Sequence, residues 1–320
     1  MDPLSDLLRV VRLDGAHFYT VEAAAPWCSE TVPAGELSPR VLPSAEHLIS
    51  YHILTDGHCF GGLVGETAVE LVAGDVIVFP HGDAHVMSSE RDGAAGRTVR
   101  TSASVRYPFT VFYGERGSPV AGASIICGFL GCDRRPFNPL LAALPRQLHV
   151  RGASSPWLGD FVRQASEAAR LGRAGAEGVV TRLAELMFIE VLRRYLDDLP
   201  PGHTGWLAGL KDEVVGRALT LLHGRAGHPW TLAELARETA SSRTNLTRRF
   251  TLLVGQPPMQ YLTRWRMQVA ANLLVQSGTK VAAIGAAVGY DSEAAFSRAF
   301  KKATGLAPGG WREARRSARS

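Results

Sequence analysis

The sequence predicts an α+β protein of two domains, in which a helical connector joins an N-terminal double-stranded β-barrel to a C-terminal all-α domain. Three observations support this prediction. Short apolar runs separated by Gly, Asp and Pro fill the first part of the chain, which is typical of closely spaced strands. The pattern becomes helical from Asn138. Segments 231–250 and 280–305 each combine an apolar-periodic helix, a tight turn and a second helix opened by Ser or Asp, which predicts two helix-turn-helix units in tandem.

These patterns divide the 320 residues into three parts. We expect residues 1–135 to form the barrel, residues 136–205 the connector and residues 206–320 the helix-turn-helix domain. The second boundary falls in a Pro- and Gly-rich stretch typical of a linker. The spacing of the apolar runs favours a sandwich or barrel, with strands expected at residues 47–54, 68–72, 75–79 and 108–114.

The connector is predicted to contain a short helix at 139–148, a second at 156–171 and a long one at 176–196. The apolar stripe of the long helix, which includes Val179, Leu183 and Leu186, is wider than one neighbour needs. It therefore indicates either burial against the barrel or the seam of a homodimer, and both alternatives stay open.

Charge is distributed unevenly along the chain, although the net charge is only +5. Residues 211–320 hold 17 Lys and Arg against 7 Asp and Glu, whereas residues 1–210 hold 18 against 23. A basic segment of this kind indicates a polyanion partner. The sequence has no apolar run long enough for a membrane span and no signal peptide, so we expect a cytoplasmic protein without a membrane partner. Four cysteines in such a chain do not suggest a disulfide scaffold.

The second helix of each unit is expected to enter the major groove of DNA, and we call these the first reader helix (243–254) and the second reader helix (293–304). In the first, Leu246, Phe250 and Leu253 are expected in the core. Its outward residues are candidates for base contacts, since Arg can grip guanine and Asn adenine; they are Arg243, Thr244, Asn245, Thr247 and Arg248. Arg249 and Arg264 are expected to meet phosphates.

In the second reader helix, Phe296 and Phe300 are expected in the core. The residues expected to face the groove are Glu293, Ala294, Ser297, Arg298 and Lys301. Arg298 is the best single candidate for base readout, although a phosphate contact or a surface salt bridge would use the same residue type.

The C-terminal segment resembles the DNA-binding domain of AraC/XylS-type transcriptional regulators. The resemblance covers 206–316 and is carried by HPWTLAELA, SSRTNLTRRF and IGAAVGYDSEAAFSRAFKKATGLAP, with a closing GWR. It implies two reader helices in successive major grooves of promoter DNA, and a transcriptional activator that contacts RNA polymerase. One departure is Gly285, where the family usually has Ala, and Gly within a helix costs roughly 0.5–1 kcal/mol against Ala.

The segment GDVIVFPHGDAH, residues 74–85, resembles the second motif of the cupin superfamily, a small double-stranded β-barrel. The first cupin motif is not intact, because Ser50 stands where the metal-binding Glu would be and the His-x-His pair is absent. With LSDLLRVVRLDGAHF and YHILTDGHCF, this region resembles the cupin-type sensor domain of a subgroup of AraC-type regulators. The broken motif gives poor support to an iron-dependent dioxygenase.

A modified site remains possible in the barrel. Ser50 and His52 share one strand face by alternation and, with His85, form a candidate effector pocket. Zn²⁺ is a candidate cofactor because imidazole and thiolate suit it, with possible ligands His52, His81, His85 and Cys59. The alternative is that His52 and His85 are hydrogen-bonded core histidines.

Cys127 and Cys132, in CGFLGC, are candidate redox residues, because some members of the resembling subgroup are implicated in responses to oxidants or electrophiles. An extended strand would hold them over ~15 Å apart, so pairing requires a bend. The alternative is that both are small buried apolar residues.

Together these observations predict a non-enzymatic, homodimeric transcription regulator that senses a small molecule, metal or oxidant of unknown identity. Two alternatives are a metal-dependent barrel enzyme fused to a DNA reader, and a constitutive DNA binder with a vestigial barrel.

Overall fold

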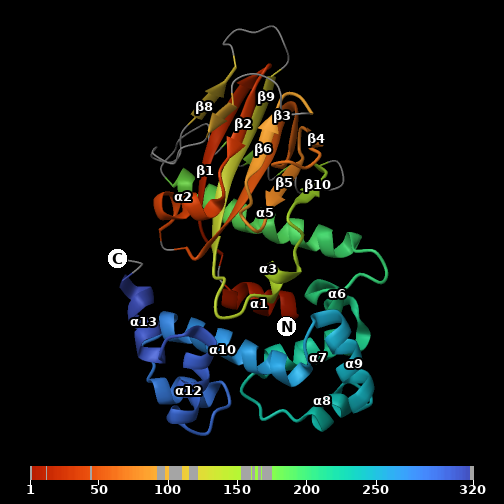
Figure 1. Ribbon diagram of the computed structural model, residues 1–320, viewed down its shortest axis with the longest axis vertical. Coiled ribbons are helices and arrows are strands. Elements are labelled where there is room, and N and C mark those ends of the chain that lie inside the picture. Colours follow the sequence, from red (N-terminus) through yellow and green to blue (C-terminus); the bar gives the residue numbers. More distant parts are fainter. Residues whose placement is uncertain are drawn as a thin grey trace. The chain divides into compact units, whose positions relative to one another are not determined.

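The computed structural model describes residues 2–11, 13–43, 45–91, 98–100, 110–114, 122–152 and 175–317, and single positions at 160, 163, 164 and 167. The chain forms two compact units (Figure 1). A barrel unit comprises Leu13–Cys132 and Leu144–Asp198, and a helical unit comprises Met1–Arg12, Asp133–Ala143 and Leu199–Ser320.

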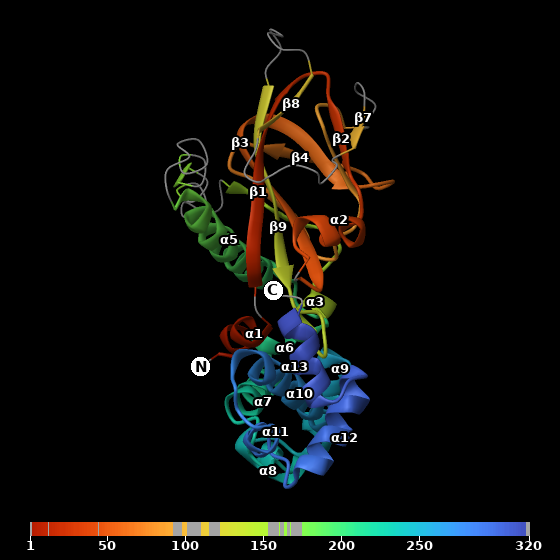
Figure 2. The ribbon, with the colours of Figure 1, turned by 90° about the vertical axis from the view of Figure 1, so that its left-hand side faces the viewer.

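The barrel unit is a curled β-sheet, as predicted (Figure 2). Its strands follow the order β7-β2-β6-β3-β9-β1-β8, with β4 and β5 paired to β3, and β10 paired to β5. They are β1 (Leu13–Ala24), β2 (Cys28–Thr31), β3 (His47–Leu63), β4 (Val69–Val72), β5 (Val76–Phe79), β6 (His85–Ser88), β7 (Thr98–Arg100), β8 (Thr110–Tyr113), β9 (Gly122–Cys132) and β10 (Leu148–Val150).

The long strand β3 is the reason the sheet curls. Its first part pairs with β9 and β5, and its last part pairs with β4 and β6. The pairing with β9 shifts register between Leu54 and Asp56, and such irregularities bend a strand. Gly57 follows at φ 76°, where a Cβ atom would lie 1.9 Å from the carbonyl oxygen of Gly122, so only glycine fits this bend.

Inward side chains fill the curl with a core that includes Leu54, Ile77, Phe79 and Phe129. Helix α2 (Ala34–Val41) packs against β3, and helix α5 (Ala176–Asp198) packs against β1 and β10. Helix α5 confirms the predicted long helix and its burial against the barrel on one face. The predicted helix at 156–171 lies largely outside the described residues.

The helical unit is arranged around α10, whose side chains are buried along most of its length. Its helices are α1 (Pro3–Val11), α3 (Pro139–Ala143), α6 (Trp206–Lys211), α7 (Glu213–Gly224), α8 (Leu232–Glu238), α9 (Arg243–Val254), α10 (Pro258–Gln276), α11 (Val281–Ala287), α12 (Glu293–Thr304) and α13 (Pro308–Ser317). Within the described residues, no helix is long and apolar enough to cross a membrane.

The division of the chain differs from the sequence-based boundaries in three places. The N-terminal helix α1 packs against α7 and α10, so it belongs to the helical unit and not to the barrel. Residues 133–143 also belong to the helical unit, whereas α5 belongs to the barrel unit. The physical reason is that apolar periodicity shows that a helix has a buried face, but not which surface covers it.

Candidate nucleic-acid interface and barrel interior

The two reader helices, α9 and α12, begin and end in the same way. Ser242 Oγ accepts a hydrogen bond from the backbone N–H of Asn245 at 3.2 Å, and Ser292 Oγ accepts one from Ala295 at 3.2 Å. Each helix ends at a glycine with φ 80°, Gly255 or Gly305. Local sequence fixes both ends, because Ser favours the N-cap and Gly tolerates the left-handed C-cap.

The first reader helix buries Leu246 and Phe250 completely, as expected, while Leu253 is only half-buried. Arg243, Thr244 and Arg248 are exposed, and Thr247 is half-buried on the same outward face.

Asn245 is less available for base contacts than its position in the first reader helix suggests. Its side-chain amide donates to Ser241 Oγ at 2.9 Å, so it supports the turn that precedes the helix. Its Oδ1 atom accepts from Arg248 at 3.4 Å, so base recognition by Asn245 would use its second N–H and compete with Arg248 for the amide oxygen.

Arg249 was expected at a phosphate, but its guanidinium forms an ion pair with Asp212. Asp212 also caps α7 by accepting from the backbone N–H groups of Val214 and Val215. Partial burial acts to raise the pKa of Asp212, but the bonds from Arg249 and these two amides outweigh it and lower the pKa. The structure therefore pairs Arg249 with Asp212, while 41% of the Arg249 side chain remains exposed.

Arg264, the other expected phosphate contact, lies over the ring of Phe137 at 4.2 Å and donates to Gln256 Oε1 at 3.2 Å. Arg264 remains exposed. Phe137, which it contacts, was expected in the connector and not in the helix-turn-helix domain.

The second reader helix buries Phe296 and Phe300 and exposes Glu293, Ala294, Arg298 and Lys301, with Ser297 half-buried. Among the described residues, Arg298 and Lys301 make no hydrogen bond or ion pair, so both can turn to a ligand without breaking an internal contact.

Gly285 has a packing role that its helix propensity does not reveal. A Cβ atom at this position would lie 3.0 Å from Cβ of Phe296, so the glycine lets α11 approach the second reader helix closely. Helix α11 forms despite the glycine.

Inside the barrel, three buried side chains form a hydrogen-bonded chain. His52 Nδ1 lies 2.9 Å from Cys127 Sγ, and His52 Nε2 lies 2.7 Å from His85 Nε2. His85 Nδ1 lies 2.9 Å from the carbonyl oxygen of Asp83, which can only accept. The strand register explains the first contact, since His52 on β3 pairs with Cys127 on β9.

The Asp83 carbonyl determines where each proton sits when both histidines are neutral. His85 must donate from Nδ1, so its Nε2 accepts from His52 Nε2–H. His52 Nδ1 then accepts, and the Cys127 thiol must donate to it. Burial lowers the pKa of His52 well below its usual value and that of His85 to about 4, which supports the neutral forms. Burial also raises the pKa of Cys127, so its thiol stays protonated.

The predicted zinc set is not brought together. His81 Nε2 lies 2.9 Å from the carbonyl oxygen of Leu144, in a contact separate from the His52–His85 pair. His52 has both ring nitrogens occupied, and no group of three or more His, Cys, Asp or Glu among the described residues could hold a metal ion. These residues therefore do not fit a zinc centre.

Cys127 and Cys132 lie on one continuous strand, β9, and both are buried. Five residues of strand separate them by about 16 Å and place them on opposite faces, so they cannot pair while the strand persists. Sequence reasoning missed the partner that Cys127 does have, His52, because the pairing of β3 with β9 joins residues 75 positions apart.

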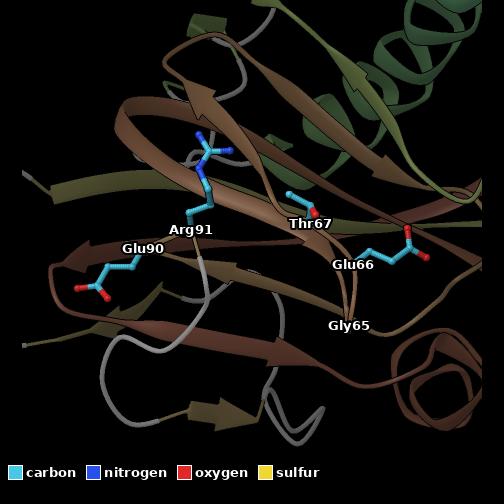
Figure 3. A pocket seen from close by; sticks show the side chains of 5 residues that line it. All are labelled: Gly65, Glu66, Thr67, Glu90 and Arg91. Atoms are coloured by element: carbon cyan, nitrogen blue, oxygen red, sulfur yellow. The ribbon is translucent and has the colours of Figure 1, made fainter.

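The predicted effector residues Ser50, His52 and His85 are between 0% and 4% exposed, and two of them bond to each other. A more open space lies at the turn between β3 and β4, and it is lined by Gly65, Glu66, Thr67, Glu90 and Arg91 (Figure 3). A cavity of about 190 Å³ adjoins it, and its lining includes Cys28, Glu30 and Ser88. Nothing in the sequence pattern indicates this space, because it depends on the pairing of β6 with both β2 and β3.

Comparison with known proteins identifies a cupin domain and a helix-turn-helix domain in this chain. A protein-family model described as a cupin matches residues 2–197, and one described as a helix-turn-helix domain matches residues 235–314. An AraC-like transcription regulator of Streptomyces antibioticus is 49% identical over 135 residues, which is 42% of this chain and 45% of that protein. The transcriptional regulator AlkR of Acinetobacter baylyi is 26% identical over 98% of this chain and 99% of its own length. A helix-turn-helix transcriptional regulator of Haemophilus influenzae is 30% identical over 82% of this chain and 85% of its own. The match to the Streptomyces relative thus spans less than half of that protein.

Proposed function

Since the chain belongs to the AraC-type family of helix-turn-helix transcriptional regulators and carries a cupin N-terminal domain, we propose that it binds promoter DNA sequence-specifically and regulates transcription in response to a signal. The observation that carries the proposal is the pair of reader helices, which have the same capping and present exposed basic residues, Arg243 and Arg248 on the first and Arg298 and Lys301 on the second.

The two reader helices offer equivalent arginines to DNA. Arg248 lies six positions after the Ser242 cap, and Arg298 lies six positions after the Ser292 cap. An exposed Arg in this part of a recognition helix can bind guanine O6 and N7 with two hydrogen bonds. Helix α10 connects the two helix-turn-helix units and, at 19 residues, is about 28 Å long. That length suits two major grooves on one DNA face, which lie about 34 Å apart.

Selection of bound duplexes from a random pool, using the full-length protein, tests the proposal. We expect a motif of two elements separated by about one helical turn. A protein that enriches no motif would contradict sequence-specific binding, and a single element would mean that one reader helix does not contact bases.

We also propose that α5 pairs with the α5 of a second copy. Opposite its barrel-facing side, Val179 is 50% exposed and Leu186 is 48% exposed. In an antiparallel pair centred on Leu186, Arg182 of one copy would stand opposite Glu190 of the other, which is a favourable arrangement of charges.

Leu186→Glu should therefore shift a dimer to a monomer in analytical ultracentrifugation. The matched control is Leu306→Glu, because Leu306 is 43% exposed in the helical unit. A folded Leu186→Glu protein that remains dimeric would exclude this seam.

We propose that the signal is a small molecule and that it binds in the cavity lined by Cys28, Glu30 and Ser88, with Arg91 beside it. The support is that this space is open to solvent, whereas His52 and His85 are enclosed. The bound form would favour one arrangement of the protein that activates transcription with RNA polymerase. Transcription from a selected promoter with purified polymerase, with and without an added metabolite library, tests this. Activity that is indifferent to every compound would favour constitutive binding.

A further inference from the structure

Residues 133–143 follow the last residue of β9 and lie in the helical unit, where we call them the brace. The brace holds its own shape through Asn138. This side chain donates to the carbonyl oxygen of Asp133 at 2.8 Å and accepts from the backbone N–H of Leu141 at 3.1 Å. It thereby caps the short helix α3 and closes the segment on itself.

One end of the brace contacts the half of the unit that contains the second reader helix. Asp133 Oδ1 lies 3.5 Å from Arg315 Nη1 on α13, and Arg315 stacks on the ring of Trp311 at 4.7 Å. Helix α13 packs against α12, and Trp311 contacts Phe300 of that helix with a centroid distance of 5.8 Å. Asp133 is therefore linked to Phe300 of the second reader helix through two side chains, Arg315 and Trp311.

The middle of the brace is bound to α10. The backbone N–H of Phe137 donates to Gln268 Oε1 at 2.9 Å, and Gln268 is only 1% exposed. The ring of Phe137 lies between Tyr261, at 5.4 Å, and the guanidinium of Arg264, at 4.2 Å. A buried amide oxygen that accepts a buried N–H fixes one register of the brace on this helix, because any slip leaves both groups without a partner.

The other end contacts the half that contains the first reader helix. Helix α3 packs against α6, and α6 packs against α9. Tyr261, which the Phe137 ring touches, also contacts Phe250 of the first reader helix with a centroid distance of 5.5 Å. The brace thus reaches both halves of the reader and the helix between them.

From these contacts we infer that the brace is a positioning element that sets the relative orientation of the two reader helices, and so the spacing of DNA elements that the protein accepts. The inference rests on the proposed DNA-reading function. Two helices must meet grooves that repeat every 10–10.5 base pairs, so a small change in their mutual angle changes which spacing fits best.

The brace is also covalently continuous with the barrel unit. A single peptide bond joins Asp133 to Cys132, the end of β9, and β9 pairs along its length with β1 and β3.

The test uses full-length Gln268→Met, which removes the acceptor for the Phe137 N–H without changing the size of the side chain greatly. The matched control is Gln260→Met, the same change at an exposed position of α10. Affinity is measured for three duplexes: the selected two-element site, the same site with two inserted base pairs, and a single element.

Two inserted base pairs rotate one element by roughly 70° relative to the other. We expect wild type and Gln260→Met to disfavour this duplex by at least about tenfold, and Gln268→Met to lose most of that preference while binding the single element as wild type does. A merely structural role would weaken all three duplexes equally. A folded Gln268→Met protein with undiminished spacing preference would overturn the inference.

If Gln268→Met does not fold, Asp133→Asn tests the same role at the partly exposed end of the brace, and should likewise relax spacing preference. Failure of the wild-type protein to bind any two-element site would instead contradict the proposed function, so the two failures are distinguishable.

Discussion

The positions of the protons along the hydrogen-bonded chain of Cys127, His52 and His85 can be tested by replacing the Cys127 thiol. In Cys127→Ala, His52 Nδ1 loses the donor that lies 2.9 Å away and is left buried and unpaired. An unsatisfied buried acceptor costs about 1–3 kcal/mol, and the lost sulfur adds roughly 1 kcal/mol of packing, so we expect a loss of about 2–4 kcal/mol. Cys127→Ser keeps a hydrogen-bond donor, so its free energy of unfolding should fall by about 1–2 kcal/mol less than that of Cys127→Ala.

Urea unfolding of the full-length protein measures this difference, and ¹⁵N NMR of the histidine rings reads the protons directly. We expect the hydrogen on Nε2 of His52 and on Nδ1 of His85 in wild type and in Cys127→Ser. Equal destabilisation by Ala and Ser, together with a hydrogen on Nδ1 of His52, would refute the reasoning.

The remaining predictions concern acid stability and DNA contacts. Because burial lowers the pKa of His85 from 6.5 to about 4, its contribution to stability is complete above pH 6.5 and is lost as the pH falls to about 4, a loss of the order of 3 kcal/mol. Unfolding at stepped pH measures this loss, and His85→Gln should reduce it, leaving the part that comes from buried His52. Arg249→Ala should leave the dependence of DNA affinity on salt unchanged, since Arg249 pairs with Asp212, whereas loss of a phosphate contact reduces the slope by about 0.9. Arg298→Ala should relax specificity at one base position by about 1–3 kcal/mol, as measured by competition with single-base variants, and a uniform loss over all variants would indicate a phosphate contact instead.

Local sequence determined the parts of this protein that depend on neighbours three or four residues apart. Ser242 and Ser292 cap the reader helices, and Phe250 and Phe296 are buried within them, as periodicity predicted. The exposure of Arg298 follows from the same pattern. Such features are encoded locally because helix caps and helix faces involve only residues within one turn.

The roles of several site residues were decided only by tertiary structure. Arg249 has the residue type and position of a phosphate contact, yet Asp212, 37 residues earlier, binds it. Cys127 was expected to be either a redox residue with Cys132 or a small buried apolar residue; it is buried, and it is hydrogen-bonded to His52 on another strand.

The sequence by itself determined the two kinds of domain, the reader helices and the charge of the DNA-binding segment. Tertiary structure alone decided that residues 133–143 brace the reader, through the bond between Phe137 and Gln268, 131 positions apart. The physical reason is that periodicity and composition record how much of an element is buried, whereas the identity of its partner depends on which distant surfaces the fold brings together.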